Sequence, residues 1–127
     1  MGRRGVLILA AEPHGERHQI VRLSEIAPVD CPCGKSRRAF VDDLEQVASL
    51  HLVEISVDAR AHYHKRMTEI YFVLEGAGEI ELDGLRQSIR PGDAILIKPG
   101  CRHRAIGKLK LLNTAIPAFD PADEWFD

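Results

Sequence analysis

The chain has 127 residues, of which 45% are hydrophobic and 28% are charged, a balance typical of one folded domain. Its formal net charge is −2 and no basic run exceeds two residues, so it lacks the positive surface by which proteins bind nucleic acid or anionic membranes. Its longest apolar run, residues 6–11, is far shorter than the roughly 20 residues of a transmembrane helix. We therefore expect a single domain over residues 1–127 whose partners include neither nucleic acid nor a membrane.

The N-terminus and the cysteines bear on the compartment. Residues 1–11 have the charged and apolar parts of a signal peptide, but the apolar part is short and no small-residue cleavage site follows it. We therefore predict a cytoplasmic protein whose three cysteines are reduced, since an odd number cannot pair completely. Cys31 and Cys33 form a C-x-C motif. We expect them to bind no metal, because a structural zinc site normally has a second pair of ligands.

Short apolar runs separated by turn residues predict an all-β sandwich or barrel. Asp83-Gly84, flanked by apolar residues, is typical of a type I′ hairpin turn. A further turn is expected at residues 75–78, where two glycines interrupt the pattern. The predicted strands, in chain order, are 6–10, 49–57, 70–74, 79–82, 86–89, 94–97, 102–106 and 110–116.

The remaining segments carry weaker patterns. Residues 12–38 are mixed in charge and punctuated by proline and glycine, which suits an edge strand or an N-terminal arm. Helical periodicity is limited to residues 42–48 and 121–126, each long enough for one or two turns. The sequence therefore predicts one barrel with additional segments at both ends.

Three histidines and one glutamate are spaced so that they can meet. His62 and His64 are two residues apart, and on an extended strand such side chains point to the same face. Glu69 follows after a spacer long enough for a turn, and His103 comes from a later strand, next to a Pro-Gly turn. Neutral imidazoles and a carboxylate suit Fe, Mn, Ni, Cu or Zn better than Ca or Mg. We therefore predict one divalent transition metal bound by these four residues.

The same four residues resemble part of the cupin signature. Cupins are small double-stranded β-helix (jelly-roll) barrels, and their first motif reads G-x5-H-x-H-x3,4-E-x6-G. His62, His64, Glu69 and Gly76 match this motif in register, while Ser56 stands at the opening glycine. All three metal-binding positions of the motif therefore carry the expected type of ligand.

The second cupin motif reads G-x5-P-x-G-x2-H-x3-N. Gly92, Gly100 and His103 match it, while Lys98 replaces the proline and Gly107 replaces the closing asparagine. The resemblance covers about residues 49–116 and implies a jelly-roll barrel core there, with a site of three histidines and one glutamate. The departures fall at turn or packing positions, so they bear on the mouth of the barrel more than on metal binding.

Four further side chains are candidates for the surroundings of the metal. Tyr71 lies two residues beyond the glutamate and is expected on the same face, as a general acid or base or as a packing residue; cupin sulfoniopropionate lyases have a similar tyrosine. Cys101 lies two residues before the last histidine and is a candidate neighbour of the site. Arg37 and Arg38 either bind a substrate carboxylate or phosphate from the N-terminal arm or remain solvated.

These features predict a metal-binding small cupin, most simply a mononuclear enzyme that acts on a small anionic metabolite by dioxygenase, isomerase or lyase chemistry. The alternative is a non-catalytic barrel that binds a sugar or an organic acid, and a third reading gives the metal a purely structural role. The resemblance to small cupins also implies a homodimer. Phe119, Trp125 and Phe126 in the C-terminal tail are expected to pack on the outer sheet or on a partner subunit.

Overall fold

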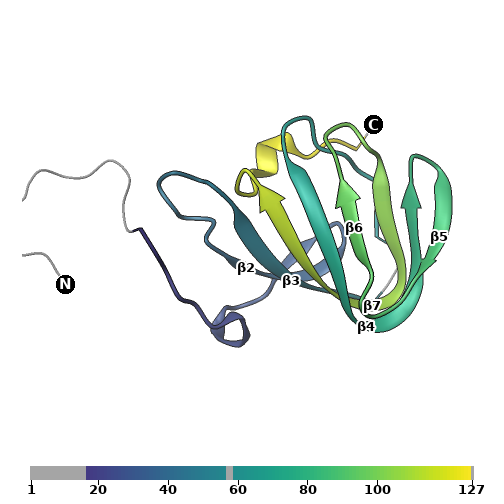
Figure 1. Cartoon of the computed structure of the whole chain (residues 1–127), viewed down its shortest axis with the longest axis horizontal. Helices are drawn as coiled ribbons and strands as arrows, with labels where there is room; N and C mark the ends of the chain where they lie inside the picture. Colours follow the sequence, from purple (N-terminus) through teal and green to yellow (C-terminus); the bar gives the residue numbers. More distant parts are fainter. Residues whose placement is uncertain (1–16, 57–58, 127) are drawn as a thin grey trace, which may run out of the picture.

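The computed structural model describes residues 17–56 and 59–126 (Figure 1). The strand predicted at residues 6–10 and the start of the predicted arm lie outside these residues. Within them the chain is all-β, as predicted, and neither of its two short 3-10 helices has the length or the apolar character to cross a membrane. The elements are η1 (Leu23–Glu25), β1 (Val29–Cys31), β2 (Gly34–Ala39), β3 (Ser49–Ile55), β4 (Thr68–Leu82), β5 (Leu85–Ile89), β6 (Ala94–Ile97), β7 (His103–Ile116) and η2 (Pro121–Asp123).

The strands form one antiparallel sheet in the order β1-β2-β3-β7-β4-β5, with β6 also paired to β4. β4 pairs with β7 from Thr68↔Ile116 to Leu82↔His103, which is its whole length. Its other edge is shared between β6 and β5. Figure 1 shows β4 and β7 bending together, so that the sheet wraps around on itself. The predicted jelly roll is therefore confirmed.

β4 and β7 are each a single long strand, whereas the sequence predicted a turn within β4 at residues 75–78 and a break within β7. Glycines explain the difference. A bulge follows Val73, and Gly76 there has φ +91°. Gly78 pairs with Gly107, and a Cβ atom on Gly78 would lie 2.1 Å from a carbonyl oxygen of β7. The glycines let the two backbones bend and approach closely while they stay hydrogen-bonded.

The predicted turns and helical segments had mixed outcomes. Asp83 and Gly84 have φ values of 50° and 85°, as a type I′ hairpin turn requires. The predicted helical turn at 121–126 is confirmed in part by η2. The one at 42–48 is wrong, because that segment forms only turns. Gln46 within it has a positive φ of 52°, which an α-helix does not accept.

The described part of the N-terminal segment forms the edge of the sheet, which is one of the two roles predicted for it, an edge strand or an arm. β1 and β2 form a hairpin, and β2 pairs with β3. Cys31 and Cys33, on either side of Pro32 in the hairpin turn, form a disulfide. The expectation that these cysteines are reduced is therefore wrong for this structure. The cysteines therefore no longer support the predicted cytoplasmic location.

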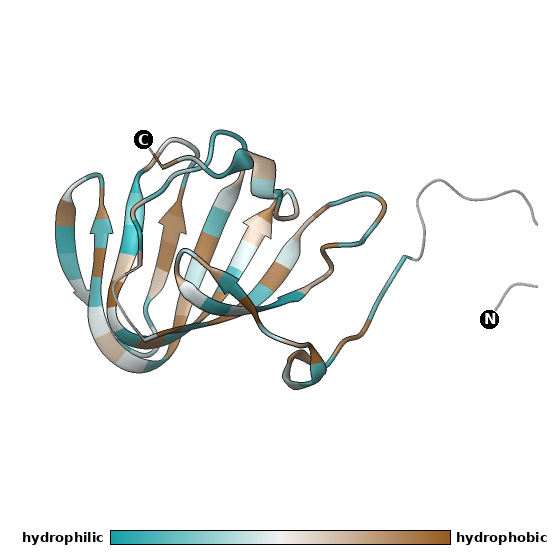
Figure 2. Ribbon diagram, turned by 180° about the vertical axis from the view of Figure 1, so that it is seen from behind, coloured by the Kyte–Doolittle hydropathy of each residue, from teal (hydrophilic) through white to brown (hydrophobic). Residues whose placement is uncertain are grey.

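The core lies between the walls of the rolled sheet. Alternate residues of β3, β4 and β7 point inward and are buried, so the strands show alternating hydrophobic and hydrophilic bands (Figure 2). The same alternation places a set of buried polar residues at one end of the interior, beside the aliphatic cluster. The aliphatic and aromatic members of the core include Val53, Ile55, Tyr71, Val73, Ile80, Ile97, Leu109 and Leu111.

Gly76 offers a test of how β4 bends. Gly76→Ala combines a positive φ with a Cβ atom 2.2 Å from the carbonyl oxygen of Lys108. Gly92 has a similar φ of +96° but open space around its Cβ position, so Gly92→Ala is the matched control. We expect Gly92→Ala to lower the free energy of unfolding by about 1–2 kcal/mol and Gly76→Ala to lower it by more than about 3 kcal/mol. Equal losses in urea unfolding would show that the close contact of β4 with β7 is not needed.

Candidate metal centre

Four buried side chains meet inside the barrel, and they are the four predicted from the sequence. His62 and His64 lie in the segment between β3 and β4, and Glu69 points inward from the start of β4. His103 is the first residue of β7. A β-bridge joins it to His62: the N–H of His62 donates to the carbonyl of His103 at 3.1 Å, and the reverse bond is 2.9 Å. The fold thus holds the first and last ligand side by side.

The four ligand atoms lie within 4.8 Å of one another. Oε1 of Glu69 is 3.2 Å from Nε2 of His64 and 3.0 Å from Nε2 of His103. Metal–ligand bonds to nitrogen or oxygen are about 2.0–2.2 Å long, so two ligands of one ion are at most about 4.4 Å apart. A small contraction of the group therefore brings all four atoms onto one ion.

The outward nitrogen of each imidazole fixes the proton of its ring. In all three histidines Nδ1 lies within hydrogen-bond distance of a backbone carbonyl. A carbonyl only accepts, so each Nδ1 donates and each Nε2 of a neutral ring presents a lone pair to the centre. The carbonyls belong to Arg60 for His62 (3.0 Å), Asp123 for His64 (2.8 Å) and Cys101 for His103 (2.9 Å).

When the three rings are neutral, the centre lacks a hydrogen-bond donor for these lone pairs. Nε2 of His64, Nε2 of His103 and Oε1 of Glu69 are buried and have no hydrogen-bond partner in the described part of the chain. Buried polar atoms without a partner are rare and costly, and here all of them are acceptors. A divalent cation satisfies them together. The donor set therefore fits the metal that the sequence predicts.

Ionisation of the group agrees with this fit. Burial alone would raise the pKa of Glu69, but the imidazoles of His103 and His64 outweigh it and lower the pKa, so the carboxylate is anionic at neutral pH. Burial, with His103 beside it, lowers the pKa of His62 to about 4, so this ring is neutral. Burial also opposes the charged form of His64, but Glu69 outweighs it and raises the pKa of that ring. Protonation of His64 and metal binding at this site therefore compete with each other.

Two residues that the sequence analysis did not single out support the ligands. The side-chain amide of Asn113 in β7 donates to Oε2 of Glu69 at 2.8 Å, which leaves Oε1 facing the histidines. The carboxylate of Asp123 in η2 accepts three backbone N–H groups from the segment that follows His64. Asn113 is a polar residue among the inward positions of β7, which after His103 are otherwise small or apolar, a signal that a search for polar exceptions would have found. Asp123 carries no comparable signal.

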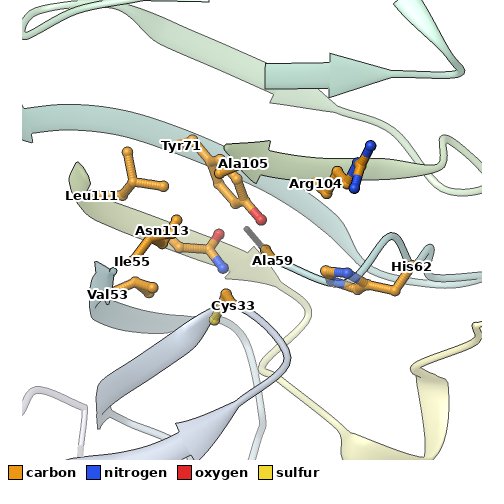
Figure 3. Close-up of a pocket in the computed structure, with 10 residues that line it drawn as sticks. All are labelled: Cys33, Val53, Ile55, Ala59, His62, Tyr71, Arg104, Ala105, Leu111 and Asn113. Atoms are coloured by element: carbon orange, nitrogen blue, oxygen red, sulfur yellow. The ribbon is translucent and has the colours of Figure 1, made fainter. Parts of the chain in front are cut away.

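A narrow cavity adjoins one of the four residues, His62 (Figure 3). Its volume is about 20 Å³, counted as the space open to the centre of a water molecule, so it has room for one or two waters. Tyr71 and Asn113 line it, and Figure 3 shows the hydroxyl of Tyr71 and the amide of Asn113 both directed into this space. Burial and the nearby Glu69 raise the pKa of Tyr71 well above its usual value, so the phenol is protonated. Most of the remaining wall is aliphatic: Val53, Ile55, Ala59, Ala105 and Leu111.

The other predicted neighbours have different positions. Arg38 stands opposite the buried His51 in the β2–β3 pair, so it faces the interior, and its Nε has no hydrogen-bond partner in the described part of the chain. Arg37 points to the other face and donates to the carbonyls of Ser24 and Ile26. The backbone carbonyl of Cys101 binds the last histidine, whereas its thiol lies within reach of its neighbour's carbonyl at 3.7 Å. Of these residues, Arg38 is the charged one that faces the interior, where its guanidinium group lies over the ring of Phe119, 4.4 Å from the centroid.

The aromatic residues of the C-terminal tail pack near the ligands. Phe119 contacts His51 edge-on, with a centroid distance of 5.6 Å, and Phe126 lies 6.0 Å from His62 by the same measure. Trp125 forms a β-bridge with Tyr63, between the two first histidines. Phe119 and Phe126 therefore pack within the chain at this end of the barrel and not on the outer sheet. Trp125 is 39% exposed, and its packing on a partner subunit stays a prediction. Figure 1 shows the tail crossing the same end of the barrel as the loop before β4.

The fold and this site define a jelly-roll barrel with a cluster of three histidines and one glutamate, and comparison with known proteins agrees. The family model described as the cupin domain matches residues 51–109. The chain therefore contains a cupin domain, which the match places at residues 51–109. A curated relative, an uncharacterized protein of Methanocaldococcus jannaschii, is 33% identical over 76 residues, which are 57% of this chain and 61% of the relative. The match thus spans only about three fifths of that protein.

Solved structures extend the similarity of the fold. A protein from Planctomyces limnophilus is 45% identical, and the match covers 86% of this chain and 96% of that one with a TM-score of 0.82. Pac13, a nucleoside dehydratase from Streptomyces, is 18% identical and has a TM-score of 0.74, with 84% of this chain and 88% of that one covered. The similarity to Pac13 shows a shared fold.

Removal of one ligand tests the metal centre. We expect His103→Ala to lower the affinity for Zn²⁺ or Co²⁺ by at least about 100-fold, because the remaining atoms no longer surround the ion. His18, which is exposed, gives the control variant His18→Ala, whose affinity should equal that of the wild type. Isothermal titration measures both, and tight stoichiometric binding by a folded His103→Ala protein would refute the ligand assignment.

Proposed function

We propose that this cupin is a mononuclear metalloenzyme that acts on a small anionic metabolite. The observation that carries the proposal is the buried group of three Nε2 lone pairs and one carboxylate oxygen beside a cavity that also receives a phenol and an amide. Structural metal sites are usually closed and rich in thiolate, whereas this group has no cysteine. Such an arrangement suits an ion that keeps one or two positions for a ligand from solution.

The ion is a divalent transition metal, with Fe, Mn, Ni, Cu and Zn as candidates for this donor set. One carboxylate leaves a divalent ion with a net charge of about +1, which favours an anionic oxygen ligand. When bound, the ion supplies Lewis acidity to an enolisable or carboxylate substrate, or the redox chemistry of a dioxygenase. Isomerase, lyase and dioxygenase reactions are all compatible with these ligands.

The chain's own residues have separable roles in this proposal. Asn113 holds Glu69 by the 2.8 Å hydrogen bond, so the carboxylate stays aimed at the histidines. Tyr71, whose ring is nearly perpendicular to that of His103 at a centroid distance of 6.0 Å, offers a hydrogen bond or a proton to a substrate oxygen in the cavity. Arg38, half-buried and facing the same interior, attracts the negative charge of the substrate. A small anion is therefore favoured over a neutral or cationic molecule.

Turnover by the metal-loaded protein tests the proposal. We expect one member of a panel of 2-oxo acids, dicarboxylates and phosphate monoesters to be consumed, as followed by NMR. His103→Ala should abolish the reaction, and Tyr71→Phe, which retains the metal, should slow it by about 10²–10⁴-fold, the usual contribution of a positioned acid or base. A metal-loaded protein that neither binds nor converts any of these anions would contradict the proposal.

A second candidate is a non-catalytic barrel that binds a sugar or an organic acid. The aliphatic wall of the cavity supports it, because binding pockets are mostly apolar with few polar groups. Since the cavity has room for only one or two water molecules, a sugar or an organic acid requires it to widen. The same panel separates the two functions. Binding of an anion that shifts the Co²⁺ spectrum, without any chemical change in that anion, would favour this candidate.

We further propose that the protein forms a homodimer through the outer face of β4, β6 and β7. Four large apolar side chains are exposed on this face: Ile70 (39%), Phe72 (41%), Leu96 (58%) and Ile116 (44%). Ile70 is paired with Leu96, and Thr68 with Ile116, so they belong to one continuous surface. A symmetric partner presents the same apolar surface and would cover it.

Introduction of negative charge into this apolar face tests the dimer. We expect Phe72→Glu with Leu96→Glu to convert a dimer into a folded monomer in light scattering coupled to size exclusion, because two like-charged faces repel each other. Leu85→Glu is the control, since Leu85 is 77% exposed but lies on β5. A monomeric wild-type protein, or a double variant that stays dimeric, would contradict this interface.

A further inference from the structure

The C-terminal tail is fixed beside the segment that supplies two metal ligands. The N–H of Tyr63 donates to the carbonyl of Trp125 at 2.9 Å, and the N–H of Trp125 donates back at 3.0 Å. The ammonium group of Lys65 lies 3.7 Å from the centroid of the Trp125 ring, and the indole N–H donates to Asp123 at 3.3 Å. Residues on both sides of Glu124 are thus held in place.

The register of this bridge determines where Glu124 points. Tyr63 is opposite Trp125 in an antiparallel pair, so Glu124 stands opposite His64 and Phe126 stands opposite His62. Side chains alternate between the two faces of an extended strand. Glu124 and Phe126 therefore share the face of the two histidines. The ring contact between Phe126 and His62 agrees with this placement.

The carboxylate of Glu124 faces an imidazole that cannot donate to it. Its Oε2 lies 3.9 Å from Nε2 of His62, and its side chain is only 16% exposed. This distance is too long for a hydrogen bond, and His62 has its ring proton on Nδ1, bonded to the carbonyl of Arg60. Two acceptors thus face each other across a largely buried gap. The gap is also shorter than the limit of about 4.4 Å for two ligands of one ion.

We infer that Glu124 is a fifth, exchangeable ligand of the metal, supplied by the C-terminal tail. This inference rests on the proposed metal centre. Glu124 lies outside the group of four mutually close ligand atoms and approaches that group from the side of His62. From this side it reaches the same ion after a shift toward the rest of the group. An anionic substrate competes with this carboxylate for the ion, so the tail gives the site a closed resting state that a suitable anion opens.

A purely electrostatic role is the competing explanation. Arg38 is half-buried, its Nε has no hydrogen-bond partner in the described part of the chain, and its charge interacts with that of Glu124. In this case Glu124 acts only as a counter-ion of Arg38. Its replacement would then change the stability of the metal-free protein but not the surroundings of a bound metal.

The two roles are separated by Co²⁺, whose visible spectrum reports its coordination number. We expect the full-length Glu124→Gln protein to bind Co²⁺ at least about 10-fold more weakly than the wild type and with a changed visible spectrum. Glu54→Gln is the matched control, because Glu54 is exposed on the outer face of β3, and it should reproduce the wild-type affinity and spectrum. Circular dichroism and metal-free melting curves verify that both variants fold.

Each outcome decides the inference. Unchanged affinity and spectrum in a folded Glu124→Gln protein would overturn it, and a lower metal-free melting temperature alongside them would assign Glu124 to Arg38. Failure of the wild type itself to bind Co²⁺ would instead refute the metal centre. A weakened affinity with an altered spectrum, confined to Glu124→Gln, supports a ligand on the tail.

Discussion

Three imidazole nitrogens and one carboxylate oxygen converge inside this barrel, and when the rings are neutral each presents a lone pair rather than a proton to the others. Hydrogen bonds from Nδ1 of each histidine to a backbone carbonyl enforce this arrangement, because they leave Nε2 as the acceptor. Buried acceptors that face one another repel and lack the solvation that water would give them. A bound cation turns this cost into a favourable interaction, so metal binding and the stability of this end of the barrel are coupled.

The fold supplies that convergence from distant parts of the chain. β4 and β7 run together over their whole length, which places Glu69 and His103 at opposite ends of the same strand pair. Their shared bend, with Gly78 against Gly107, brings the two ends back toward each other. The tail then closes the arrangement, since η2 provides the carbonyl that orients His64 and the carboxylate that holds the loop after it. The curvature of the barrel therefore determines how the four ligand side chains are placed.

The sequence predicted which four side chains meet at the centre better than it predicted their surroundings. His62, His64, Glu69 and His103 belong to motifs with fixed spacing, and local extended geometry is enough to place the first two on one face. Asn113 and the tail contacts depend on pairing between residues more than 40 positions apart, which no local pattern encodes. Glycines in the long strands were mistaken for turns, because close backbone approach and chain reversal both select glycine.

Anomalous diffraction from crystals of protein purified without added metal tests the central claim most directly. Data collected on both sides of the absorption edges of Fe, Mn, Ni, Cu and Zn identify any ion by its element and position. The account predicts one anomalous peak about 2.0–2.2 Å from Nε2 of the three histidines and from Oε1 of Glu69. A centre without any such peak, in which a proton shared between His64 and Glu69 holds the group together, would contradict it.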